Sequence, residues 1–108
     1  MIMICMKNLD GFRAKIFRAL SDPIRLKILE CLRSGEKCVC DIVLRVRIAQ
    51  PMVSRHLAIL KGCGLVTYRR EGNKRIYSVT NPAVFRLIDM VNKSLADSLT
   101  KRIIKQMV

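Results

Sequence analysis

The chain has 108 residues, of which 51% are hydrophobic and 27% charged, a composition typical of one globular domain and not of a disordered chain. Its net charge of +13 favours an anionic partner, nucleic acid or an acidic membrane surface, although a merely solvated basic surface would give the same total. No apolar run approaches the roughly 18 residues of a membrane span, and MIMICM at the start lacks the flanks of a signal peptide, so we expect a cytoplasmic protein.

Four helices are predicted in the first part of the chain, after an N-terminal arm at residues 1–8. Apolar residues at three- and four-residue steps place these helices at about 9–20, 23–34, 41–46 and 51–62. Asp22 as a cap and Pro23 at the first helical position mark the start of the second helix. Pro51 opens the fourth.

The second part of the chain changes from helical to alternating periodicity at Leu65. Two β-rich arms over 65–80 flank Glu71-Gly72-Asn73-Lys74, which is a strong hairpin signal. A last helix over 81–108 has an apolar face that runs from Val84 to Leu99. That face is longer than so small a domain can cover alone, which favours a dimer surface. Folding back onto the chain's own core is the alternative, and the two are compatible.

This order of elements predicts a mainly α protein with one β-hairpin, a winged helix-turn-helix. The helix-turn-helix spans about residues 41–62 of the helical part 9–64, the wing is 65–80, and the whole chain is one DNA-binding domain. An enzyme is not expected, because one histidine and no Gly-rich phosphate loop leave little with which to build an active site. A membrane partner is not expected either, because the basic residues do not follow one amphipathic face.

The fourth helix and the wing carry the candidate DNA-binding residues. Polar and basic side chains near the start of such a helix suit base edges and phosphates, with Arg55 a partner for guanine and Gln50 for adenine. Cations on the wing suit phosphates or a minor groove. His56 lies on the buried side of its helix, where packing or a phosphate contact is favoured over a metal ligand. The candidates are Gln50, Met52, Ser54, Arg55, His56, Lys61, Arg69, Arg70, Lys74 and Arg75, with Arg45 and Arg47 as further backbone contacts.

Four segments resemble the ArsR/SmtB family of metal-responsive transcriptional repressors: SDPIRLKILECL, CVCDI, QPMVSRHLAILKGCGLV and RREGNKRIYSV. The resemblance covers about residues 14–80, and CVCD followed by QPxVSRHL at this distance is its most specific part. It implies a winged-helix homodimer, built through the first and last helices, that binds double-stranded operator DNA. It also implies release from the operator when an inducer metal or metalloid binds. No other protein partner is inferred.

The resemblance further implies where the inducer binds. Arsenic-responsive members carry CVCDLC; here Cys38 and Cys40 match its first two cysteines, but Val43 stands at the third. Cadmium- and lead-responsive members add a cysteine from an N-terminal arm, a part that Cys5 can play from the partner subunit. The zinc site on the last helix of other members is absent, because its positions correspond to Asn81, Ala83, Ser94 and Asp97.

The chemistry of the pair favours a soft ligand. Thiolates select arsenite and antimonite, our first expectation, or soft divalent ions such as cadmium, lead and zinc; no permanently bound cofactor is expected. Residues two apart point about 200° from each other in a helix, but share a side in an extended segment. Cys38 and Cys40 therefore either precede the third helix, with Asp41 as its N-cap, or grip one ion by unwinding its first turn. Unwinding would move the recognition helix against the dimer and lower DNA affinity.

Other roles for the cysteines stay open. Cys38 and Cys40 could serve a redox or persulfide sensor without metal, or be inert small hydrophobes in a DNA-binding architectural protein. Cys31 is expected in the core, and Cys63 as a small filler or an exposed, redox-active thiol. The odd number of cysteines, five, argues against a disulfide framework.

Overall fold

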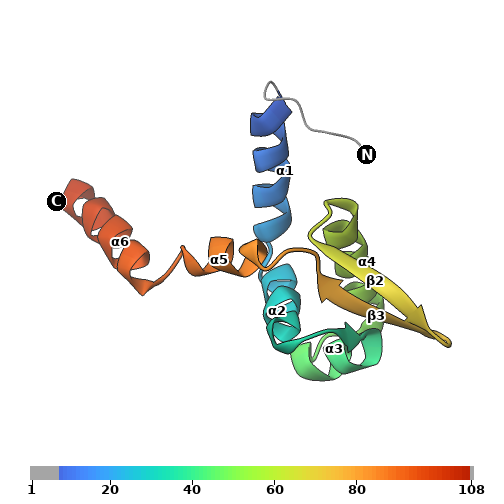
Figure 1. Ribbon diagram of the computed structural model, residues 1–108. Coiled ribbons are helices and arrows are strands. Elements are labelled where there is room, and N and C mark those ends of the chain that lie inside the picture. Colours follow the sequence, from blue (N-terminus) through green and yellow to red (C-terminus); the bar gives the residue numbers. More distant parts are fainter. Residues whose placement is uncertain (1–7, 108) are drawn as a thin grey trace.

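A computed structural model describes residues 8–107 of the chain, with side chains as far as Ile103 (Figure 1). The four helices and the hairpin come in the predicted order, so the winged helix-turn-helix is confirmed. Among these residues, no helix combines the length and the apolar character that crossing a membrane requires. The elements are α1 (Leu9–Leu20), α2 (Pro23–Cys31), the 3₁₀ turn η2 (Leu32–Ser34), β1 (Lys37–Cys38), α3 (Val39–Val46), α4 (Gln50–Gly62), β2 (Val66–Glu71), β3 (Lys74–Val79), α5 (Ala83–Asp89) and α6 (Lys93–Met107).

The cap predicted for α2 is present. Asp22 is extended, and its Oδ1 accepts hydrogen bonds from the backbone N–H groups of Ile24 (2.8 Å) and Arg25 (3.1 Å), with Pro23 at the first helical position. These bonds, the one from Arg25 foremost, hold the pKa of the Asp22 carboxyl below its usual 3.8. The start of α2 is thereby fixed by its own side chain.

The core lies where α2, α3 and α4 meet the sheet. Its centre includes the stripe predicted for α4, so the face that this helix turns outward is set by packing. The largest completely buried side chains are Ile28, Leu29, Ile42, Val53, Leu57 and Leu60.

The wing is the predicted hairpin. β2 and β3 pair antiparallel from Val66 opposite Val79 to Glu71 opposite Lys74. Gly72 has a positive φ of 61°, so the two-residue turn carries glycine at its first central position, where the backbone would strain any other residue.

The sheet has a third strand that the sequence analysis did not predict. The strand order is β1-β3-β2, and β1 pairs antiparallel with β3, with Lys37 opposite Tyr77 and Cys38 opposite Ile76. A strand of two residues has no periodicity for a pattern to detect. The first cysteine of the CxC pair is therefore part of the wing sheet.

The start of α3 also differs from the prediction. α3 begins at Val39, two residues earlier than expected, with Cys38 and not Asp41 at its N-cap position. Cys38 is extended there (φ −75°, ψ 164°) and makes no side-chain capping bond. The two cysteines thus neither both precede the helix nor both lie inside it.

The predicted last helix is divided into two. Asn92 separates α5 from α6, and its Oδ1 accepts a hydrogen bond from the backbone N–H of Leu95 (3.0 Å). Val84 is buried and Leu87 and Ile88 pack against the core, whereas every described side chain of α6 is exposed. Figure 1 shows α6 pointing away from both α1 and the wing. Folding back onto the core therefore holds for α5 and not for α6, whose apolar face stays available for the predicted dimer surface.

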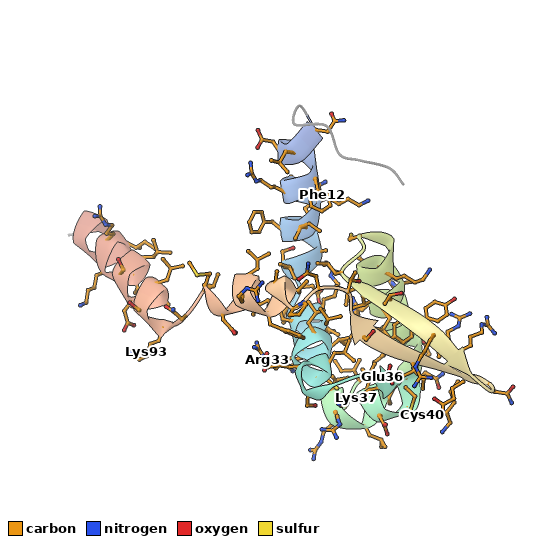
Figure 2. All side chains as sticks on the ribbon, in the orientation of Figure 1. Phe12, Arg33, Glu36, Lys37, Cys40 and Lys93 are labelled. Atoms are coloured by element: carbon orange, nitrogen blue, oxygen red, sulfur yellow. The ribbon has the colours of Figure 1, made fainter. Side chains whose placement is uncertain are left out.

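α5 is held in place by Arg33, the middle residue of η2 (Figure 2). The Arg33 guanidinium donates to both carboxylate oxygens of Asp89 (2.8 and 2.9 Å) and to those of Glu30 (2.8 and 2.9 Å), and its Cζ lies 4.8 Å from the Phe85 ring centroid. The bonds from Arg33 lower the pKa of Asp89. This bridge fixes the end of α5, from which the chain departs toward α6.

Candidate nucleic-acid interface and thiol site

A tight turn sets the angle between α3 and α4. Arg47 caps α3 in the left-handed conformation (φ 57°, ψ 43°), and its N–H donates to the carbonyl of Val43 (2.9 Å). α4 begins three residues later, at Gln50, with Pro51 in its first turn as predicted. Because the stripe of Val53, Leu57 and Leu60 is buried, the opposite face of α4 is presented to solvent.

That outward face carries the residues predicted to contact DNA. Gln50, Met52, Ser54, Arg55 and Lys61 are all exposed. The first three lie in the first turns of the helix, where the positive end of the helix dipole also favours a phosphate. α4 therefore has the composition and exposure of a recognition helix; the individual contacts remain predictions.

His56 points in another direction and joins α4 to the corner between α1 and α2. Its Nδ1 lies 3.3 Å from Nη1 of Arg25, whose Nε donates to the carbonyl of Ala19 (2.6 Å). Since a guanidinium can only donate, Nδ1 is assigned as the acceptor and the ring proton to Nε2. This contact supports the packing role given to His56, and a phosphate contact through Nε2 stays a prediction.

The four cations predicted for the wing fall into two groups. Arg69 donates to Glu36 (2.7 and 3.2 Å) and to Glu71 (2.8 Å). These bonds raise the pKa of the Arg69 guanidinium, with Glu36 the larger cause, and Arg69 in turn lowers the pKa of Glu36. Arg70, Lys74 and Arg75 form no ion pair with any residue of the described part of the chain.

Tyr68 organises the side of the wing that faces α4, a role that the sequence analysis missed. The Lys61 ammonium lies 5.1 Å and the Arg75 guanidinium 4.9 Å from the Tyr68 ring centroid, and Tyr77 packs on the same ring at 5.3 Å. A tyrosine directly before two arginines in an alternating strand was the only available signal. The ring brings one cation from the helix and one from the wing together.

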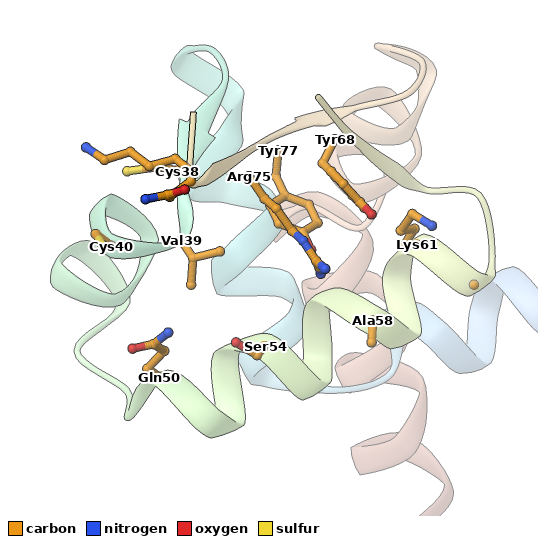
Figure 3. Close-up of a pocket in the computed structure, with 13 residues that line it drawn as sticks. Cys38, Val39, Cys40, Gln50, Ser54, Ala58, Lys61, Tyr68, Arg75 and Tyr77 are labelled. Atoms are coloured by element: carbon orange, nitrogen blue, oxygen red, sulfur yellow. The ribbon is translucent and has the colours of Figure 1, made fainter. Parts of the chain in front are cut away.

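A cavity of about 590 Å³ lies between α4, the start of α3 and the wing (Figure 3). Gln50, Ser54 and Lys61 line it from α4, and Arg75 from β3; Cys38 and Cys40 lie at one end of it. The thiol pair thus borders the same cavity as five of the predicted DNA-contacting residues, which their separation in sequence gave no means of predicting.

The cysteines differ in exposure. Cys40, in the first turn of α3, is exposed and Cys38 is half-buried. Cys31 packs against the core, where burial raises its pKa, and Cys63 packs there as well. Cys5 lies outside the described residues. Within residues 8–107, no group of three or more Cys, His, Asp or Glu side chains is arranged to hold a metal ion.

The positions matching the zinc site of other family members have structural contacts. Asn81 Oδ1 accepts from the backbone N–H of Ala83 (2.9 Å) at the start of α5. Asp97 accepts from Lys93 Nζ (2.7 Å) one turn away on α6.

An exposed recognition helix beside a cationic wing defines a winged helix-turn-helix regulator that binds DNA. More particularly, the chain belongs to the arsR family of bacterial regulatory proteins, which matches it over residues 22–68.

Similar proteins agree with this assignment. The chain is 44% identical over 85 residues to a probable mercury resistance operon repressor of Streptomyces lividans, covering 79% of this chain and 68% of that protein. It is 39% identical over 80 residues to the arsenical resistance operon repressor of Staphylococcus xylosus, covering 74% and 73%. Among solved structures, the homodimeric winged helix-turn-helix DNA-binding domain Mb0332 from Mycobacterium bovis superposes with a TM-score of 0.75 at 31% identity, covering 94% of this chain and 95% of that one.

Proposed function

We propose that this protein is a cytoplasmic, homodimeric repressor that binds operator DNA through α4 and the wing. A soft metal ion or metalloid releases it by binding to Cys38 and Cys40, with Cys5 completing the site. Arsenite or antimonite is the first candidate for the inducer, and a soft divalent ion such as cadmium, lead or zinc the second. The observation that carries this proposal is the cavity whose wall includes both cysteines and the outward side chains of α4.

The DNA-binding half of the proposal is supported by where the positive charge lies. Most of the exposed cations of α4 and the wing have no carboxylate partner in the described chain, and Lys61, Lys74 and Arg75 among them border one concave surface. A net charge of +13 makes the loss of condensed counterions from DNA the dominant driving force for association.

The dimer is supported by exposed apolar side chains on the two helices outside the core. Leu95, Leu99 and Ile103 recur at four-residue steps along α6 and are 39, 53 and 57% exposed. On α1, Phe12 and Phe17 are 39 and 57% exposed. Apolar surface at this spacing is stable in water when a second copy covers it, and the similar Mycobacterium bovis domain is homodimeric.

The inducer half is supported by the chemistry and position of the thiols. Two thiolates one residue apart suit a soft ion, and similar proteins carry the names of mercury and arsenical resistance repressors. Cys38 is extended while Cys40 is helical. Capture of one ion by both sulfurs would therefore act on the first turn of α3, which precedes the recognition helix.

The test is a release experiment on a duplex that the protein has selected from a random-sequence pool. Arsenite, antimonite, cadmium, lead, zinc and mercury(II) are titrated into the reduced protein bound to labelled DNA, and dissociation is followed by fluorescence anisotropy. At least one ion should lower affinity about 5- to 150-fold, the usual range of allosteric coupling. Cys38→Ser and Cys40→Ser should abolish this response, whereas Cys63→Ser should retain it.

Two results would overturn the inducer assignment. A double Cys38→Ser, Cys40→Ser variant that is released as readily as the parent would separate the thiols from the response. Release by a mild oxidant, with a linked pair of thiols in the mass spectrum and no effect of any ion, would instead identify a redox sensor. Tight binding that is insensitive to ions and oxidant alike would leave an architectural DNA-binding protein.

A further inference from the structure

We propose that the thiol site acts on DNA affinity through the wing, and that Arg69 is the positioning residue that ties the cysteine strand to it. This inference rests on the proposed function and specifies how its inducer site is coupled to DNA. It also removes Arg69 from the predicted DNA contacts.

The first step is the backbone connection between β1 and the wing. Cys38 pairs with Ile76 of β3, and Ile76 in turn pairs with Arg69 of β2. Residues directly opposite one another in an antiparallel sheet project on the same face. Cys38, Ile76 and Arg69 therefore form one row across the three strands. A displacement of Cys38 acts on β3 at Ile76, the residue next to Arg75.

The second step is the side-chain connection along the same face. Glu36 stands two residues before Cys38, on the same side of the extended segment. Both of its carboxylate oxygens accept from Arg69, at 2.7 and 3.2 Å, while a third Arg69 nitrogen donates to Glu71 at 2.8 Å. The segment entering the thiol site is thus fastened to the wing twice, through β3 and through Arg69.

Arg69 and its neighbour Arg70 differ in the face of the sheet from which they project and in their carboxylate partners. Arg70 follows Arg69 by one residue and lies opposite Arg75, so both project from the face of the sheet opposite to Arg69, where Arg75 contacts the Tyr68 ring. Two carboxylates already neutralise Arg69, and a phosphate would have to displace them. Arg70 is exposed and has no ion pair within residues 8–103, which is the condition of a phosphate-binding cation.

The consequence is a route for the inducer signal that does not pass through the dimer. An ion that draws Cys38 toward Cys40 pulls on β1, strains its pairing with β3 and shifts the Glu36–Arg69 bridge. The wing then turns relative to α4, and the cations on its other face lose their positions on the DNA.

The experiment compares Arg69→Gln and Glu36→Gln with the matched control Arg70→Gln. The probes are arsenite and cadmium(II), and their uptake is measured by protection of the cysteines against alkylation. The main readout is the ratio of DNA dissociation constants with and without the ion. For Arg69→Gln and Glu36→Gln we expect protection to persist while this ratio falls at least fivefold. For Arg70→Gln we expect weaker DNA binding with and without the ion and an unchanged ratio.

The salt dependence of DNA binding provides a second readout. Removing a phosphate contact lowers the slope of log affinity against log salt by about 0.9, so Arg70→Gln should lower it and Arg69→Gln should not. The exchanged pair Glu36→Arg with Arg69→Glu should restore most of the lost ratio, which a merely misfolded variant would not do.

The outcomes distinguish this inference from the function on which it rests. If none of the six ions of the release experiment frees the parent protein from DNA, the proposed function fails and the coupling route fails with it. If the parent is released and both Arg69→Gln and Glu36→Gln are released by the same ratio, only the route through Arg69 is wrong. A reduced salt slope for Arg69→Gln would return Arg69 to the DNA contacts.

Discussion

Arg47 holds the turn between α3 and α4 in a backbone conformation that suits glycine better than arginine, so Arg47→Gly should stabilise the domain. Its φ of 57° and ψ of 43° lie in the left-handed region, which costs a residue with a Cβ about 1–2 kcal/mol. Glycine removes that cost but loses about 0.5–1 kcal/mol more backbone entropy on folding. The balance is a gain of about 0.5–1 kcal/mol, which for a domain of this size raises the melting temperature by roughly 2–8 °C.

The assay is thermal unfolding followed by circular dichroism at one fixed protein concentration, because association with a second copy would also shift the transition. Arg45→Gly is the matched control. Arg45 lies in the last turn of α3 and not in the left-handed region, so glycine there should cost about 1 kcal/mol. If Arg47→Gly lowers the melting temperature as much as Arg45→Gly does, backbone strain at Arg47 is not what limits this turn.

The same variant separates stability from DNA binding. If Arg47 contacts a DNA phosphate, Arg47→Gly should bind DNA more weakly while melting at a higher temperature, and its salt slope should fall by about 0.9. An unchanged slope would remove Arg47 from the DNA contacts without affecting the stability argument.

Two further predictions concern the ends of the domain. Because the hydrogen bonds from Arg25 and Ile24 lower the pKa of Asp22 in the folded state, their stabilising effect is complete above the unfolded value and is lost as the pH falls through the folded one. Urea unfolding below about pH 4 should therefore show a steeper loss of stability for the parent than for Asp22→Asn, which keeps a capping oxygen but does not titrate; equal slopes would contradict the assignment. On α6, Leu99→Glu should raise the dissociation constant of the dimer at least 100-fold. The substitution removes one leucine from each subunit, and burial of each leucine stabilises the dimer by about 1.5–3 kcal/mol. Light scattering over a dilution series measures it, and Ser98→Glu on the same helix should leave the dimer intact.

Local signals predicted most of the fold. The sequence Ser21-Asp22-Pro23 specifies a helix start by itself, because the capping oxygen and the proline act within four residues. Gly72 does the same for the tip of the wing, where a positive φ is required. The outward face of α4 followed from the period of its buried stripe, since packing on one side determines exposure on the other.

What could not be predicted depends on residues far apart in the chain. β1 forms because its two residues pair with the edge of β3, which lies almost 40 positions later in the chain. α3 begins directly after this strand, at Val39. Arg69 and Arg70 are adjacent and chemically identical, but Arg69 pairs with Glu36, which lies 33 residues before it in the chain, and with Glu71. The helix break at Asn92 could not be predicted for a different reason. The apolar period continues across this residue, although its side chain accepts a hydrogen bond from the N–H of Leu95 and caps the start of α6.

Lys61 and Arg75 both contact the ring of Tyr68. This contact affects how much side-chain conformational entropy the protein loses when it binds a DNA duplex. Long cationic side chains normally give up much rotational freedom on reaching a phosphate. Here an aromatic surface already restricts two of them, one from the helix and one from the hairpin, so part of that loss has occurred during folding. The distance between the Lys61 and Arg75 side chains is consequently restricted before DNA binds. The protein can therefore favour DNA whose phosphate spacing matches that distance.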